Sequence, residues 1–409
     1  MSIPIKIDSE VRPRWLNRTV LGIGLTSLFS DWSHEMATAI LPAFLASIGA
    51  GPGWLGIIEG VSDGLSSVSK LASGYFTDTL PRRKPAVLAG YALTTIAIGS
   101  IAWATSATQV LFARTAAWLG RGARSSGRKA LLADAVPRAA YGRAFGFERM
   151  LDTLGAIAAP ATALWLLART SHNYSRVFLW TLVPALLSVA CFAFLVKESP
   201  NRTPSRHSFL MGLRGLPTPF RRFLLAVGIF GLGDFSHTLL ILYATQALTP
   251  VHGRAVAASI AVGLYLLHNC FYAAFAYFGG WLSDRVRQRR IVLAAGYLLA
   301  AVMAGILVKG VHEVLWLGVV FALAGIFAGV QETLPDSVAA ELVSDNLHGM
   351  AFGTLAAVNA VGDFASSLVI GLLWTSVSSG SAFGLAGALF LASAILLLWP
   401  ERTEPASAG

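Results

Sequence analysis

Twelve stretches of predominantly apolar residues run through the chain, and they restrict its possible folds more than any other feature. Each stretch approaches or exceeds the roughly 20 residues that an α-helix needs to cross a bilayer. Backbone groups in lipid must bond internally, and an α-helix achieves this within one segment. We therefore predict an all-α integral membrane protein with twelve transmembrane helices, at residues 19–48, 53–76, 86–108, 109–132, 143–168, 177–196, 222–248, 255–282, 291–309, 313–334, 347–375 and 380–399.

The composition is that of a membrane protein rather than a soluble one. Of the 409 residues, 55% are hydrophobic and 13% are charged, and the mean hydropathy is +0.64. Soluble domains average about 25% charged residues. The first apolar stretch is too long for a signal peptide, so we expect it to be retained as a helix. Cys191 and Cys270 both fall inside apolar stretches, which indicates no disulfide framework.

The basic residues are distributed unequally between the two sides that these helices define. The formal net charge is +10, and 22 Lys and Arg residues fall on the side of the termini, against 4 on the other side. This count places Arg128 and Lys129 between the fourth and fifth helices. Because positive segments stay in the cytoplasm, the asymmetry predicts cytoplasmic N and C termini. It leaves no basic module for nucleic acid, so we expect no nucleic-acid partner.

Three short motifs recur in chain order at offsets of 203, 206 and 207 residues. The pairs are Asp31-Trp32-Ser33-His34 with Asp234-Phe235-Ser236-His237, Gly74–Asp78 with Gly280–Asp284, and Gly142–Gly146 with Gly349–Gly353. Near-constant offsets indicate two copies of one six-helix unit. We predict pseudo-symmetric bundles at residues 1–196 and 222–409, a cytoplasmic linker at 197–221, and a symmetry axis along the membrane normal.

Ionisable and polar residues inside the apolar stretches are the candidate site residues, because such groups are costly in lipid and usually face a cavity. They are Asp31, His34, Glu35, Glu59, Asp63, Arg114, Arg121, Asp234, His237, His268, Asn269 and Asp363. We expect Asp31 with Glu35 or Asp63 to carry a proton, since rocking between environments can load and release one. The alternative is that these carboxylates form fixed ion pairs with Lys70, Arg114 or Arg121.

The two arginines of the fourth stretch also allow two interpretations. A guanidinium in a cavity recognises carboxylate or phosphate well, which favours an anionic or zwitterionic substrate. Alternatively, Arg114 and Arg121 pair with Asp63, Glu148 or Asp152 as part of the packing. We expect Arg114 to act in coupling or binding and Arg121 to pair structurally.

The duplicated Asp–His pairs suggest a different substrate. Two carboxylates and two imidazoles from facing helices would suit a divalent transition metal. The alternative function is therefore transport of a divalent metal or metal chelate by Asp31, His34, Asp234 and His237. Ordinary hydrogen bonding also explains such pairs, and we expect no resident metal or cofactor.

The segment Gly74-x-x-x-Asp78-x-x-Pro81-Arg82-Arg83-Lys84 resembles the signature loop of the major facilitator superfamily of secondary transporters. The resemblance covers nearly the whole chain, and Gly280, Asp284 and Arg285 repeat part of the loop. It implies two six-helix bundles that rock around a central site. We expect Gly74, Asp78, Arg82, Arg83, Gly280, Asp284 and Arg285 to form gating loops. The hypothesis is that Asp78 contacts the other half and stabilises the outward-open state; the alternative is a solvated charge that only sets topology.

The string from Arg114 to Phe147 is similar to a bacterial and archaeal group of that superfamily, although Ala117 and Lys129 replace expected acids. Gly155–Pro160 resembles a glycine–proline motif of exporters. The sequence has no phosphate-binding loop of the GxxxxGK[ST] type, which argues against ATP drive. We predict a monomeric, multi-pass inner-membrane antiporter that exports a small amphipathic or anionic solute against protons. An intramembrane enzyme or a receptor is the competing class, and gradient-driven flux would separate them.

Overall fold

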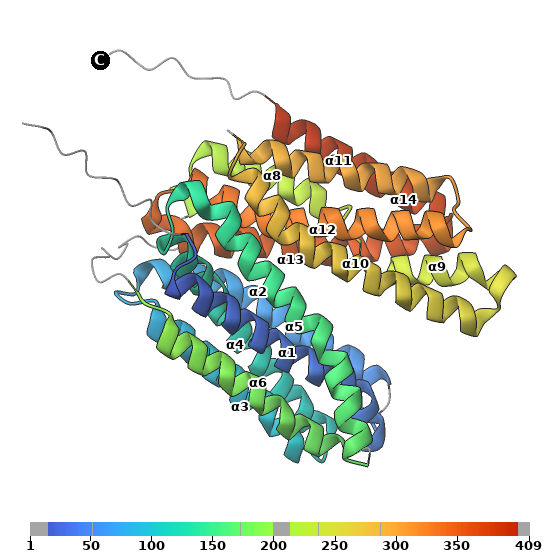
Figure 1. Ribbon diagram of the computed structural model, residues 1–409, viewed down its shortest axis with the longest axis horizontal. Coiled ribbons are helices and arrows are strands. Elements are labelled where there is room, and N and C mark those ends of the chain that lie inside the picture. Colours follow the sequence, from blue (N-terminus) through green and yellow to red (C-terminus); the bar gives the residue numbers. More distant parts are fainter. Residues whose placement is uncertain are drawn as a thin grey trace, which may run out of the picture.

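A computed structural model describes residues 15–50, 52–171, 173–198, 213–235, 237–286 and 288–399. Over these residues the regular structure is helical throughout, with no strand. Figure 1 shows two groups of helices, one from each half of the sequence, that meet near one end of the molecule. The predicted all-α fold is therefore confirmed for the described residues.

The first group, called the N-terminal half, contains six long helices joined by short loops. They are α1 (Arg18–Ser47), α2 (Pro52–Thr79), α3 (Lys84–Ser100), α4 (Ala107–Asp134), α5 (Tyr141–Arg169) and α6 (Tyr174–Leu195). Polar residues cap several of them: Asn17 accepts from the backbone of Thr19 and Val20, and Ser106 and Asn173 cap α4 and α6. These caps satisfy N–H groups that a helix leaves without partners.

The second group, called the C-terminal half, repeats the pattern with one difference. Its helices are α8 (Thr218–Gly231), α9 (His237–His252), α10 (Arg254–Ser283), α11 (Arg289–Val308), α12 (Val314–Leu342), α13 (His348–Ser376) and α14 (Ser379–Leu398). The predicted seventh span at 222–248 is divided into α8 and α9. Helix α8 begins at Thr218, before residue 222, where the predicted seventh span begins.

The interruption falls on the motif that the sequence repeats. Asp31 and His34 lie in the continuous helix α1, whereas Asp234 lies in the non-helical segment after α8 and His237 begins α9. Gly231 ends α8 and Gly233 lies within this segment, and glycine weakens a helix interior. The repeated Asp–His motif therefore lies inside a continuous helix in one half and at a helix interruption in the other.

Eight of the helical segments in the described residues are long and apolar enough to cross a membrane by length and composition alone. The seventh span falls short because α8 and α9 have only 14 and 16 residues. Helix α4 carries five basic residues, and α1 and α2 also carry ionisable residues in their interiors. The polar groups described below lie on these three helices and also on α5 and α12, which meet the criterion.

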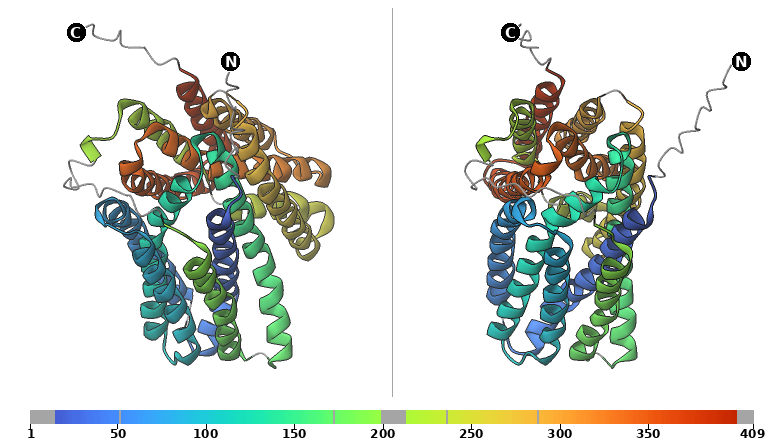
Figure 2. Two further views of the ribbon diagram at one scale, coloured as in Figure 1. Left: turned by 60° about the vertical axis from the view of Figure 1, so that its left-hand side comes forward. Right: turned by 90° about the vertical axis from the view of Figure 1, so that its left-hand side faces the viewer.

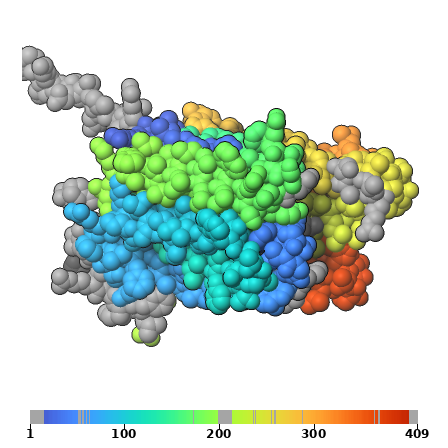
Figure 3. All heavy atoms as spheres, turned by 90° about the horizontal axis from the view of Figure 1, so that it is seen from below, coloured from blue at the N-terminus to red at the C-terminus, as the bar shows by residue number. Residues whose placement is uncertain are grey.

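The molecule has two ends, which we name by their loops. The linker side contains residues 80–83, 135–140 and 284–286, and the far side contains residues 48–50, 104–106 and 377–378. The two halves meet at the linker side and diverge toward the far side (Figure 1, Figure 2). In Figure 3 the N-terminal half forms most of the visible face.

The closest approach of the halves is made by the repeated glycines. Gly74 packs on Gly349 and Gly353 of α13, and Gly142 of α5 packs on Gly280 of α10. A Cβ atom built on Gly349 would lie 2.6 Å from the carbonyl oxygen of Gly74. Small residues allow two helix backbones to approach this closely. The sequence repeats therefore correspond to two pseudo-symmetric contacts between the halves.

Candidate functional site

A polar cavity of about 210 Å³ lies between the two halves. Helices α1, α2, α4 and α5 line it from the N-terminal half, and α12 and α13 line it from the C-terminal half. The lining residues are Ser30, Asp31, Lys70, Arg121, Arg124, Ser125, Arg128, Lys129, Arg149, Asp152, Glu332, Leu355, Ala356, Asn359 and Ala360. Six basic and three acidic side chains are among them, so the lining carries an excess of positive charge. We call this the central cavity.

Helix α4 supplies a row of arginines at spacings of 7, 3 and 4 residues, which keeps them on one helix face: Arg114, Arg121, Arg124 and Arg128. Arg124 donates to the Ser30 hydroxyl at 2.7 Å, and its guanidinium lies 3.8 Å from the centre of the Tyr91 ring. Arg114 donates to the Thr38 hydroxyl at 2.9 Å, nearer the far side, and lies outside the central cavity lining. Three of the four arginines therefore line the central cavity, and Arg114 continues the row toward the far side.

Two of these arginines pair with carboxylates of neighbouring helices. Arg121 lies 2.7 Å from Asp31 of α1, and Arg128 lies 2.9 Å from Glu148 of α5. The Ser27 hydroxyl donates to the same Glu148 carboxylate at 2.6 Å. Since charged groups are costly away from water, such pairs make the arginines tolerable inside the bundle.

Other ion pairs cross from one half to the other. Lys129 of α4 lies 2.7 Å from Asp336 of α12, and Arg149 of α5 lies 3.2 Å from Glu332 of α12. Arg149 also lies 3.2 Å from Asp152 of its own helix. Arg149 is thus shared between a carboxylate of each half, at the wall of the central cavity.

The basic residues of the central cavity retain donor capacity. In the described part of the chain, the buried Arg121 Nη1, Arg128 Nε and Arg149 Nε atoms have no hydrogen-bond partner. Buried polar atoms in proteins are nearly always hydrogen-bonded. An oxyanion in the central cavity is the chemical class of ligand that guanidinium groups of this kind recognise.

Asp31 and Arg121, two of the predicted site residues, line the central cavity and contact each other. His34 is buried elsewhere, with its ring 4.9 Å from the Trp118 ring centre in an edge-to-face contact. Glu35 lies half-buried on α1. Helices α2 and α13 hold three further predicted residues whose side chains are outside the described part of the structure: Glu59, Asp63 and Asp363.

The predicted residues of the C-terminal half gather around an aromatic cluster. The His237 and His268 ring centres are 4.7 Å apart, and Tyr265 stacks on His268 at 5.6 Å. Asn269 follows on the same helix, and the backbone carbonyl of Asp234 accepts from a serine of α13 at 2.6 Å. Among the described residues, no three His, Cys, Asp or Glu side chains are grouped to hold a metal ion. The structure therefore gives no support to the metal-transport alternative.

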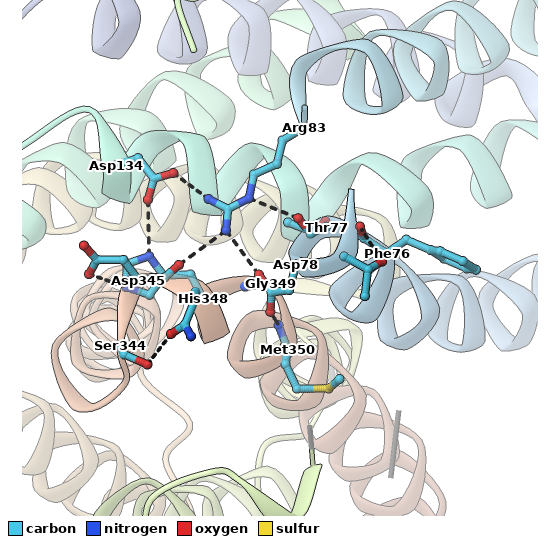
Figure 4. A network of polar contacts seen from close by, with 12 residues as sticks. Phe76, Thr77, Asp78, Arg83, Asp134, Ser344, Asp345, His348, Gly349 and Met350 are labelled. Carbon is cyan, nitrogen blue, oxygen red and sulfur yellow. Dashed lines mark hydrogen bonds and ion pairs between the residues drawn. The ribbon is translucent and has the colours of Figure 1, made fainter. Parts of the chain in front are cut away.

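On the linker side, Asp78 at the end of α2 bonds to the other half (Figure 4). Its carboxylate accepts from the backbone N–H groups of Gly349 at 3.0 Å and Met350 at 2.7 Å, the first turn of α13. Arg83 lies 3.1 Å from Asp78 and 2.5 Å from Asp134 of α4. A carboxylate at a helix N-terminus is stabilised by the helix dipole. We call this group the α2–α13 latch.

A second latch repeats the arrangement with the halves exchanged. Asp284 at the end of α10 accepts from the backbone N–H groups of Gly142 at 2.8 Å and Arg143 at 3.0 Å, the first turn of α5. Arg289 lies 3.1 Å from Asp284 and 2.7 Å from Glu341. We call this group the α10–α5 latch. Both latches join the halves on the linker side.

Two of the predicted gating residues lie outside the latches. Arg82 is exposed, and Arg285 stacks over the Trp281 ring at 3.7 Å. Their places are taken by Arg83 and Arg289. Asp78, Arg83 and Asp284 of the predicted gating residues lie in the latches, and their gating role stays a prediction.

Sequence reasoning also missed most of the central cavity lining. Arg124, Arg128, Lys129, Arg149 and Glu332 all line it. The charge count placed Arg128 and Lys129 between the fourth and fifth helices, which is wrong, because α4 continues to residue 134 and the predicted span at 109–132 already contains both residues. The spacing of Arg128, seven residues after Arg121 and four after Arg124, was the signal that could have placed it on the same helix face.

The comparisons with known proteins agree with this architecture. The sequence profile of the Major Facilitator Superfamily matches residues 23–253 and again residues 223–409. An uncharacterised MFS-type transporter of Methanocaldococcus jannaschii is 29% identical over 390 residues, covering 94% of this chain and 96% of that protein.

Solved structures share the fold at low sequence identity. The human organic anion transporter MFSD10 superposes with a TM-score of 0.74 at 18% identity, covering 93% of this chain and 99% of that one. The transporter FucP in its outward conformation has a TM-score of 0.74 at 16% identity, with 93% and 98% covered.

Proposed function

The chain belongs to the major facilitator superfamily, and we propose that it is a proton-coupled antiporter that exports a small anionic or amphipathic solute. It is a multi-pass membrane transporter and not an enzyme. The central cavity between the halves, with its excess of basic side chains, is the observation that carries the proposed substrate class.

The proposed location is the inner membrane, with the linker side in the cytoplasm. The excess of Lys and Arg on the linker side supports this orientation. In this orientation the structure corresponds to an outward-open state, because the halves are latched on the cytoplasmic side and diverge on the other. Opening both latches and closing the far side would give the inward-open state of an alternating-access cycle.

Solute recognition is assigned to the basic residues of the central cavity. Arg121 donates to Asp31 through one Nη atom, and its other Nη atom has no hydrogen-bond partner among the described residues. The Nε atom of Arg149 has none either. A carboxylate or phosphate of the solute would accept from these groups. The volume of about 210 Å³ suits a small polar group, and an apolar part of the solute would extend toward the far side.

Proton coupling is assigned to Asp31. Its ion pair with Arg121 orients the guanidinium beside the cavity. Protonation of Asp31 from the outer side would remove the charge that holds Arg121, so the solute would lose an oriented partner and leave. Binding of the proton and binding of the solute would then exclude each other at the Asp31–Arg121 pair, as antiport requires. Glu35 and Asp63 remain the other proposed proton carriers.

Binding of an oxyanion can be tested directly. Purified protein would be screened by thermal shift against carboxylates, phosphates and amphipathic anions, and each hit titrated into Arg121→Ala. The control is Arg176→Ala, which removes an exposed arginine outside the central cavity. We expect affinity to fall about 10- to 100-fold in Arg121→Ala, as for loss of a charge-assisted hydrogen bond, and to be unchanged in the control. Equal affinities in both variants would contradict the assignment.

The sign of coupling has its own test. Antiport requires that solute binding weaken when the pH falls through the titration of the proton carrier. Affinity would be measured from pH 5 to pH 8 in detergent. Tighter binding at acidic pH would indicate co-transport and would overturn proposed export by antiport.

A further inference from the structure

A second cavity, of about 690 Å³, lies at the linker side of the C-terminal half, away from the central cavity. The ends of α8, α11, α12 and α14 form it. Its lining residues are Pro219, Arg222, Phe223, Leu225, Gln288, Arg289, Arg290, Val338, Glu341, Leu342, Leu396, Leu397 and Trp399. The proposed solute and proton sites lie in the central cavity, and this space shares Arg289 and Glu341 with the α10–α5 latch.

One wall of this cavity is basic. It presents three guanidinium groups, from Arg222, Arg289 and Arg290, against a single carboxylate, from Glu341. Arg222 is exposed, and Arg290 is half-buried with Nε donating to Gln288 at 3.1 Å.

Arg289 is the buried member of this wall. Its side chain is 8% exposed, and it pairs with Glu341 at 2.7 Å. Its Nε–H is a buried donor without a hydrogen-bond partner in the described residues. The wall therefore holds more donors for an anion than the protein itself satisfies.

The other wall is apolar and faces outward. Leu225 of α8 is 58% exposed, and Trp399, directly after α14, is 67% exposed. Phe223 and Leu396 continue this surface into the cavity. Tryptophan is enriched where a transmembrane helix reaches the membrane–water interface. An occupant that suits both walls has an anionic head and an apolar tail.

We propose that this cavity is a binding site for an anionic phospholipid. The phosphate of the lipid accepts from Arg222 and Arg290, and an acyl chain lies along Leu225 and Trp399. Basic pockets between transmembrane helices at the membrane surface bind anionic headgroups in this way. A soluble phosphate would leave the apolar wall uncovered, so the two-sided lining favours a lipid. Since Arg289 also lies 3.1 Å from Asp284, the site borders the α10–α5 latch.

Native mass spectrometry of the full-length protein tests the site. Delipidated protein would be titrated with phosphatidylglycerol or phosphatidylcholine carrying the same acyl chains, and with inorganic phosphate. We expect at least one phosphatidylglycerol to be retained with about tenfold preference over phosphatidylcholine. The double variant Arg222→Ala/Arg290→Ala should lower this affinity roughly 30-fold, at about fivefold for each basic residue near a membrane surface.

The matched control is Arg214→Ala/Arg221→Ala, which removes two exposed arginines on the same side, outside the cavity lining. It should change the affinity less than twofold. An equal loss of affinity in both double variants would mean general attraction of the lipid to the protein surface and would overturn the site. Equal retention of phosphatidylglycerol and phosphatidylcholine would also overturn it, as would retention of inorganic phosphate as strong as that of phosphatidylglycerol.

The chain itself offers a competing occupant, because residues 400–409 follow Trp399 and include two glutamates. If phosphatidylglycerol bound only after removal of residues 400–409, the tail and not a lipid would occupy the cavity, and the proposal would be wrong. Thermal unfolding of each variant in detergent would establish that it is folded. These results stand apart from transport, because a protein that moves solute normally but shows no lipid preference refutes only this site.

Discussion

The α2–α13 latch gives the most quantitative prediction of the structure. Asp78 accepts two backbone N–H bonds from the first turn of α13 and one bond from Arg83. The substitution Asp78→Asn keeps one acceptor oxygen but places an NH₂ donor against one of those N–H groups. It also removes the negative charge at the α13 N-terminus. The latch therefore loses at least one charge-assisted hydrogen bond and one helix-dipole interaction.

These losses set the size of the effect. A hydrogen bond to a charged group contributes about 1.5–3 kcal/mol. A charge at a helix N-terminus contributes about 0.3–1 kcal/mol. Together they remove about 2–4 kcal/mol from the state that is latched on the linker side, which lowers its population relative to the alternative by roughly 30-fold or more.

Spin-label distances would measure this shift in a variant without native cysteines. One pair, at Thr105 and His252, spans the far side, and a second pair, at Arg82 and Gln288, spans the linker side; all four positions are exposed. In Asp78→Asn we expect a new population with a shorter far-side distance and a longer linker-side distance.

The control is Asp345→Asn, at an acid 74% exposed and 3.3 Å from Arg138 on the same side. Exposed ion pairs contribute about 0–1 kcal/mol, so this variant should keep the parental distances. Identical distance distributions in Asp78→Asn and the parent would refute the latch as a determinant of conformation.

Three further outcomes follow from the contacts between the halves. Asp284→Asn should shift the same distances in the same direction, because the α10–α5 latch repeats the geometry; no shift would indicate that only one latch holds the halves. Gly142→Ala should destabilise the latched state by about 1–3 kcal/mol through overpacking against Gly280, measured by the same labels, and unchanged populations would contradict the close packing. Asp336→Asn should leave Lys129 unpaired and lower thermal stability by several kcal/mol, whereas adding Lys129→Gln should restore most of it; additive losses in a double-mutant cycle would argue against a direct pair.

The sequence predicted the helical architecture well, because hydropathy and repeats report directly on lipid contact and on close helix approach. The repeated glycines are the clearest example: Gly74 and Gly280 recur in sequence, and each packs against a glycine of the other half. The acids Asp78 and Asp284 were also identified as gating residues, and the structure places each against the opposite half. Their effect on conformation stays a prediction.

The central cavity was harder to predict, because its lining depends on which helix faces meet. Arg128 and Lys129 looked like a basic loop, since a row of cations near a helix end also satisfies the positive-inside rule. In the structure they point between the halves and pair with Glu148 and Asp336. The different positions of the two Asp–His pairs were hard to predict for a similar reason. A four-residue sequence match does not show that the helix is interrupted near Asp234.

The most direct test of the account separates proton-driven transport from exchange in proteoliposomes. Solute found by the screen would be followed in Asp31→Asn under an imposed pH gradient and, separately, in counterflow with equal pH on both sides. Glu313→Gln, at an exposed acid on the far side, is the control. The account predicts that Asp31→Asn loses gradient-driven flux and keeps counterflow. Undiminished gradient-driven flux in Asp31→Asn would contradict the assignment of the proton to Asp31.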